Sequence, residues 1–204
     1  MTVVAPPGSL VAAEALSAVA GGNVETSSRI VDAMFSALGQ ATPMPAQGQG
    51  TMNNLTVGAP GFTYYETLAG GQGAGPDGDG PSAVHVAMSN TRNTPVEVLE
   101  VAYPLRVEEY RVRRGTGGAG RHRGGDGVTR RLRVLVDAEV SVIAERRRTG
   151  PAGAAGGHDG APGRTALNGR ELPAKWRGPV RAGDELRIDT PGGGGWGEVA
   201  HPAD

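Results

Sequence analysis

Glycine is concentrated in blocks along this chain, and those blocks limit what it can fold into. The 204 residues include 35 glycines and 15 prolines, about a quarter of the sequence, which is near the level of low-complexity segments. The densest blocks are residues 70–80, 115–127, 149–163 and 190–198. Segments with clear hydrophobic periodicity separate the blocks. The sequence therefore predicts a folded protein with long glycine-rich loops, since helices and strands do not tolerate so many glycines.

The predicted helices lie near the N-terminus. The clearest spans residues 26–40, where Ile30, Met34 and Leu38 recur at helical spacing and predict an apolar stripe that faces the core. A shorter helix is expected within residues 10–20, ended by Gly21 and Gly22. Pro95 is expected to begin another short helix or turn.

Strand patterns dominate from residue 105 onward. Residues 131–136 and 140–144 are expected to pair as a hairpin across Asp137 and Ala138, with arginines on a solvated face. The other predicted strands are residues 54–57, 62–68, 83–88, 107–113 and 185–189. The expected fold class is α+β, with a helix-containing part over residues 1–104 and a β-rich, glycine-rich part over residues 105–204.

Composition and charge exclude several classes of protein. The formal net charge is −1, whereas nucleic-acid binding requires a basic excess. The arginines of residues 111–148 are therefore interpreted first as a solvated face, then as a protein interface, and only third as an RNA surface. The chain has no cysteine, which removes disulfides and cysteine nucleophiles. No basic leader or run of ~20 apolar residues indicates secretion or a membrane span, and a cytoplasmic location is expected.

The glycine blocks contain two motif-like patterns. Residues 115–120 satisfy G-x-G-x-x-G, but the RHRGGDG that follows cannot begin the helix that a dinucleotide site needs. A tight turn is favoured, with Arg121, Arg123 and the loop amides as a candidate anion site. Asp77 and Asp79 favour a turn over a calcium loop. No phosphate-binding P-loop is present.

A polar cluster is the main candidate for chemistry. His85, Asn90, Asn93 and Glu97 lie close together in the sequence, and such groups can position a polar substrate or a metal-bound water. A lone histidine is more often structural, so both interpretations remain open at this point. The sequence identifies no metal ligands.

Five segments resemble signatures of the hydantoinase B/oxoprolinase family and occur in the family's order. They are residues 22–38 (GNVETSSRIVDAMFSAL), 62–75 (FTYYETLAGGQGAG), 85–100 (HVAMSNTRNTPVEVLE), 115–127 (GTGGAGRHRGGDG) and 190–198 (TPGGGGWGE). Each segment alone is a weak indication of the family, but five segments in the family's order are a specific one.

The resemblance implies an enzyme component that works with a hydantoinase A-type subunit in a hetero-oligomer. The A-type subunit, similar to actin-like ATPases, would bind ATP, and the pair would open the ring of a cyclic amide such as 5-oxoproline or a hydantoin. Subunits of acetone and acetophenone carboxylases are related. The resemblance carries over His85, Asn90, Asn93 and Glu97 as orienting groups, with Glu66 as a further candidate.

The resemblance also implies what this chain lacks. Family members are much longer, and their N-terminal halves carry histidine- and aspartate-rich motifs suited to a divalent metal. The expectation is therefore a component that is incomplete alone. The alternative expectation is a non-catalytic module that docks onto an A-type subunit through its arginine face.

Overall fold

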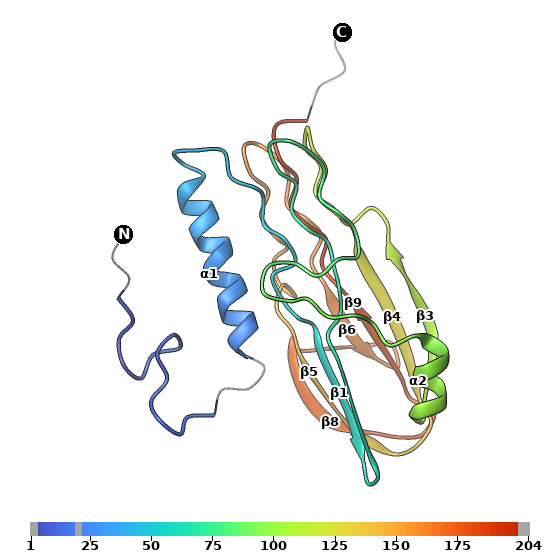
Figure 1. Ribbon diagram of the computed structural model, residues 1–204. Helices are drawn as coiled ribbons and strands as arrows, with labels where there is room; N and C mark the ends of the chain where they lie inside the picture. Colours follow the sequence, from blue (N-terminus) through green and yellow to red (C-terminus); the bar gives the residue numbers. More distant parts are fainter. Residues whose placement is uncertain (1–3, 19–21, 200–204) are drawn as a thin grey trace.

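The computed structural model describes residues 4–18 and 22–199, which form a strand-dominated α+β fold (Figure 1). Two helices occur in this part of the chain, α1 (Gly22–Leu38) and α2 (Val96–Ala102). Neither is long and apolar enough to cross a membrane. The strands in these residues are β1 (Asn54–Ala59), β2 (Phe62–Glu66), β3 (Leu105–Arg113), β4 (Gly127–Val134), β5 (Ala138–Ile143), β6 (Arg164–Leu167), β7 (Arg170–Leu172), β8 (Lys175–Val180) and β9 (Glu185–Asp189).

The strands form two antiparallel sheets with a shared core. One sheet has the order β2-β1-β5-β8, and the other has the order β3-β4-β9-β6-β7. Side chains alternate between the two faces of each strand, and the inward-facing residues of both sheets form one apolar cluster. Its buried members include Leu55, Val57, Leu132, Val134, Val140, Val142, Leu186 and Ile188.

Several predicted elements are confirmed. The strands predicted at residues 54–57, 62–68 and 107–113 correspond to β1, β2 and β3, and the strand at 185–189 is β9. Pro95 is the residue immediately before α2. Strands β6, β7 and β8 were not predicted, because their short segments lie among glycines and prolines.

The predicted hairpin is wrong. The strand in residues 131–136 belongs to β4, which pairs with β3 and β9. The next strand, β5, pairs with β1 and β8 in the other sheet. Asp137 lies at the crossing between the sheets and accepts a hydrogen bond from the Ala182 amide at 2.9 Å. Alternation identified both strands but carries no information about which strand is the partner.

Two further predictions of secondary structure are wrong. Residues 83–88 form no strand, and only Val84 makes an isolated bridge, to Gly70. The short helix expected within residues 10–20 is absent from residues 10–18, which adopt turns. Residues 19 and 20 of that prediction lie outside the described part of the chain.

Helix α1 begins earlier than predicted, at Gly22, and its apolar stripe does not face the core. Ile30, Met34 and Leu38 are 41%, 40% and 46% exposed, whereas the buried positions of the helix are Glu25, Ser28 and Asp32. The inward face is polar because it finds polar partners. Glu25 Oε1 accepts hydrogen bonds from the Thr51 hydroxyl at 2.9 Å and the Met52 amide at 2.8 Å.

The glycine blocks contain no regular helix, and only Gly127, the first residue of β4, belongs to a strand. Much of their length nevertheless lies inside the protein. Residues 191–197 are all buried. The Gly193 amide donates to the Gly125 carbonyl at 2.8 Å, while the Gly193 carbonyl accepts from the Gly118 amide at 2.8 Å. A Cβ on Gly193 would lie 1.9 Å from the Gln72 carbonyl oxygen. Glycine is required here because neighbouring backbones approach more closely than side chains allow.

Candidate functional site

His85 is joined to the end of β2 by a chain of hydroxyl groups. Thr67 is buried directly after β2, and its hydroxyl is hydrogen-bonded to that of Thr91. The Thr91 oxygen lies 3.0 Å from His85 Nε2. Burial lowers the pKa of His85, which favours the neutral imidazole. Its Nδ1 atom is buried and has no hydrogen-bond partner among the described residues, so one ring nitrogen keeps its hydrogen-bonding capacity.

A buried ion pair lies next to this chain. Glu66, the last residue of β2, immediately precedes Thr67, and its Oε1 atom is 3.4 Å from Arg130 Nη2 on β4. Arg130 points inward with Leu132 and is only 1% exposed. The pair therefore links the two sheets inside the core, where an unpaired charge would be strongly destabilising.

Asn93 is connected to the same pair. The Asn93 amide is hydrogen-bonded to the Tyr110 hydroxyl. The ring of Tyr110 lies beneath the Arg130 guanidinium, 4.5 Å from its Cζ atom, a geometry suited to cation–π attraction. A polar path thus runs from exposed Asn93 through Tyr110 and Arg130 to buried Glu66.

Several polar atoms along this path have unused capacity. Among the described residues, Glu66 Oε2, Arg130 Nε and Nη1, and the Tyr64 hydroxyl are buried and make no hydrogen bond of ordinary geometry, although Tyr64 lies close enough to Glu66 and Arg130 for both to affect its pKa. Burial raises the pKa of Glu66 despite the nearby Arg130 charge. Burial and Glu66 together raise the pKa of Tyr64. Clustered groups with shifted pKa values and unsatisfied donors are typical of functional sites, and this cluster is the candidate site.

The other two residues of the predicted cluster lie apart from the network. Asn90 and Glu97 are exposed, and no described residue forms a hydrogen bond with either side chain. Glu97 lies in the first turn of α2. The structure thus brings His85, Asn93 and Glu66 together through intermediates but leaves Asn90 and Glu97 facing solvent.

Arg121 and Arg123, the residues of the predicted anion site, both make contacts within the protein. Asp126 accepts hydrogen bonds from the amides of Thr116 at 2.9 Å and Gly117 at 2.8 Å, and from Arg123 Nη2 at 2.8 Å. Burial opposes ionisation of Asp126, but these hydrogen bonds hold its pKa below the ordinary value. Arg121 lies over the Trp196 ring, 4.8 Å from its centre. Asp126 is thus an internal carboxylate partner of Arg123.

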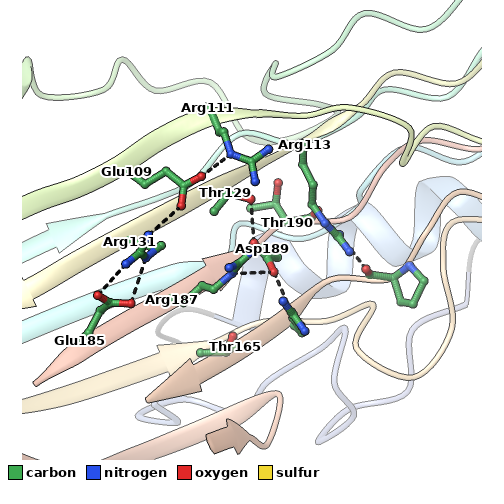
Figure 2. A network of polar contacts seen from close by, with 12 residues as sticks. Glu109, Arg111, Arg113, Thr129, Arg131, Thr165, Glu185, Arg187, Asp189 and Thr190 are labelled. Atoms are coloured by element: carbon green, nitrogen blue, oxygen red, sulfur yellow. Dashed lines mark hydrogen bonds and ion pairs between the residues drawn. The ribbon is translucent and has the colours of Figure 1, made fainter. Parts of the chain in front are cut away.

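Part of the arginine run, including Arg111, Arg113 and Arg131, lies on the outer face of the second sheet (Figure 2), whereas Arg130 and Arg146 are buried. Arg131 pairs with Glu185 at 2.8 Å and with Glu109 at 3.2 Å. Arg164 and Arg187 both pair with the buried carboxylate of Asp189. The charges are largely compensated within the sheet, which fits the interpretation of a solvated face better than that of a nucleic-acid surface.

Over residues 4–18 and 22–199, no three His, Asp or Glu side chains come close enough together to hold an ion. Asp79 instead accepts a hydrogen bond from the Arg123 amide at 2.7 Å, consistent with the turn favoured by the sequence.

Sequence reasoning missed Arg130, Tyr110, Thr67 and Thr91 as members of the site. A signal for Arg130 existed, because it shares the inward register of Leu132 and Val134 on β4. A charged residue at a core-facing position of a strand indicates a buried partner. No comparable signal identified the two threonines.

A sequence model of the family described as Hydantoinase B/oxoprolinase matches residues 1–199. The chain belongs to the hydantoinase B/oxoprolinase family. This family is the one that the five ordered segments indicated.

The relatives that the chain matches are longer proteins. A 5-oxoprolinase of Dictyostelium discoideum is 44% identical over 203 residues, covering 97% of this chain but 16% of the relative. An uncharacterized protein of Methanocaldococcus jannaschii is 41% identical over 203 residues, covering 97% of this chain and 36% of the relative. Thus the chain spans well under half the length of either relative.

A solved structure supports the fold. The ATP-dependent caprolactamase of Pseudomonas jessenii matches with a TM-score of 0.67 and 26% identity, covering 80% of this chain and 32% of the caprolactamase chain. The fold is thus similar to that of part of the longer caprolactamase chain.

Proposed function

We propose that this chain is a component of an ATP-dependent hydrolase that opens a small cyclic amide, of the 5-oxoproline or hydantoin type. The observation that carries the proposal is the identity with a 5-oxoprolinase along nearly the whole chain. The fold shared with an ATP-dependent caprolactamase, which bears the name of another cyclic amide, supports the same reaction class.

The chemistry of the substrate explains why ATP is needed. An amide carbonyl is a poor electrophile, and phosphorylation of its oxygen by ATP creates a good leaving group. Phosphoryl transfer releases ADP. A first water then adds to the carbonyl carbon, and the C–N bond breaks as the ring nitrogen takes a proton, which leaves an acyl phosphate. A second water hydrolyses the acyl phosphate to the carboxylate and phosphate. We propose that a hydantoinase A-type subunit binds the ATP, in a hetero-oligomer with this chain. Orienting the attacking water lowers the barrier to ring opening.

His85 and Asn93 are the proposed orienting groups. Neutral His85, held by Thr91 at 3.0 Å, can accept a proton from water or donate one to a developing charge. Asn93, at the exposed end of the path to Glu66, can hydrogen-bond to a substrate amide. Asn90 and Glu97 are exposed and are proposed to contribute only through contact with substrate or a partner. A divalent metal, where the reaction uses one, is proposed to lie in other parts of the assembled enzyme.

The test is a reconstitution with 5-oxoproline, ATP, an A-type subunit and the remaining hydantoinase B-type portion, with and without this chain. The expected result is formation of ring-opened product only when the chain is present. Equal product formation without the chain would contradict a catalytic role and favour a docking module. A His85→Asn variant should lose activity, by about a hundredfold if the imidazole transfers a proton, whereas Glu171→Gln, at an exposed position of β7 outside the candidate site, should retain it.

A further inference from the structure

The solvent-facing side of α1 has the composition of a protein–protein interface rather than that of a surface that stays in contact with water. The charged residues of the helix are Glu25, Arg29 and Asp32. Glu25 and Asp32 accept hydrogen bonds from Thr51 and Arg146, and Arg29 donates one to Asp32. The exposed positions are uncharged and mostly apolar: they include Ile30, Met34 and Leu38, with Asn23 and Ser36 as their polar members. Exposed apolar stripes of this kind mark contact sites.

The segment before α1 shows the same property. Residues 4–18 contain one charged residue, Glu14, and their largest apolar side chains are fully open to solvent. Leu10 is 94% exposed and Leu16 is 104% exposed. In the view of Figure 1, α1 lies between this segment and the sheets. Two neighbouring segments thus leave apolar side chains uncovered.

A pocket lies at the C-terminal end of the helix. Its volume is about 270 Å³, and its lining includes Phe35, Met44 and Trp196. The Trp196 indole nitrogen donates to the Met44 carbonyl at 2.9 Å, which fixes the wall of the pocket. A pocket of this size accepts a large apolar side chain.

We propose that residues 4–18, the outward face of α1 and this pocket form one docking surface, and that its occupant is the portion of a hydantoinase B-type protein outside the matched region. Two observations favour this occupant. The matched region makes up 16% and 36% of the length of two relatives, so homologous regions occur within much larger polypeptides. The surface is apolar and nearly uncharged, which suits a permanent contact with an apolar partner.

The proposal does not depend on the ring-opening reaction, because it concerns assembly only. The surface has no charge pattern to select a polar or anionic partner. Burial of Ile30, Met34 and Leu38 is expected to supply most of the affinity, with the pocket holding one anchoring side chain.

The probe is the portion of the M. jannaschii relative that this chain does not match. The full chain carries an affinity tag and is co-expressed with that portion, so that both fold together, and the retained amount and dissociation constant are measured. Met34→Glu should weaken binding by about thirtyfold, since it places a charge where docking would bury an apolar group. The matched control is Val101→Glu, because Val101 is a 91% exposed valine on α2 outside the surface, and it should bind as the wild type does.

Retention of the probe by the wild type and the control, but not by the Met34→Glu variant, would support the proposal. Absence of retention, or equal loss in both variants, would overturn it. Light scattering of the chain alone provides an independent check. A stable dimer that Met34→Glu dissociates would identify a second copy as the occupant and would also overturn it.

Discussion

Asp32 on α1 and Arg146, 114 residues further along the chain, form a buried ion pair with 2.8 Å between Oδ2 and Nη2. Arg146 also donates to Gln47 Oε1 at 2.7 Å. The helix is therefore attached to the body through polar bonds, and its apolar stripe is left outside. This arrangement reverses the usual amphipathic packing of a surface helix.

Replacing Asp32 with alanine should lower the free energy of unfolding by about 3 kcal/mol, because Arg146 would remain buried without its charge partner. Urea unfolding followed by circular dichroism measures the change. Glu139→Ala is the control, since Glu139 pairs with Arg177 on the surface, and should cost less than about 1 kcal/mol. Equal losses in the two variants would show that the α1 pair is not a structural anchor.

The effects of Glu66 and Arg130 on the free energy of unfolding should be strongly coupled. Arg130→Met leaves Glu66 as an unpaired buried carboxylate and should cost about 3 kcal/mol or more. The double variant Glu66→Met and Arg130→Met should recover much of that loss, because apolar replacements of a buried pair are often neutral. A double-mutant cycle of unfolding free energies tests this, and simple additivity of the two single losses would refute it.

Ionisation of Asp189 should make the free energy of unfolding depend on pH in the acid range. Burial opposes its ionisation, but hydrogen bonds from Arg164, Arg187 and Thr129 hold its pKa below the ordinary value. A carboxylate with a depressed folded-state pKa stabilises the fold above the unfolded value near ~3.9, and this stabilisation is lost as the pH falls further. Asp189→Asn should therefore cost about 2 kcal/mol at pH 7, and the difference from wild type should shrink between about pH 4 and pH 2. A difference independent of pH would contradict this assignment.

The buried glycine segments should not accept side chains. Gly193→Ala places a Cβ 1.9 Å from the Gln72 carbonyl oxygen and should cost more than about 4 kcal/mol or prevent folding. Gly75→Ala is the control, because nothing lies within 4 Å of its Cβ position. Soluble yield and thermal unfolding should separate the two variants. A Gly193→Ala protein as stable as wild type would show that the segments pack less tightly than described.

Helices and strands whose signal lies within a few neighbouring residues were predicted from the sequence. Alternation identified β3 and β9, and Pro95 indicated the start of α2. The α+β class followed from these predicted elements, and the family followed from the five ordered segments. Pairing between strands could not be predicted in the same way, because β4 and β5 carry similar alternation yet join different sheets.

The orientation of α1 and the candidate site depend on partners distant in the sequence. The stripe at Ile30 and Met34 predicted an inward face, but Thr51 and Arg146 supply polar partners for the opposite side. Likewise, His85 and Asn93 were selected as polar residues in one segment, whereas the connection to Glu66 passes through other strands. No local pattern contains those contacts.

The most direct test of the proposed function measures ATP consumption and ring-opened product together. An A-type subunit and the remaining B-type portion are held constant while this chain is titrated into a solution of ATP and 5-oxoproline. Product is predicted to rise with added chain until the complex is saturated and to remain coupled to ATP hydrolysis. Product that is independent of the chain, or ATP hydrolysis that never yields ring-opened product at any amount of chain, would contradict the account.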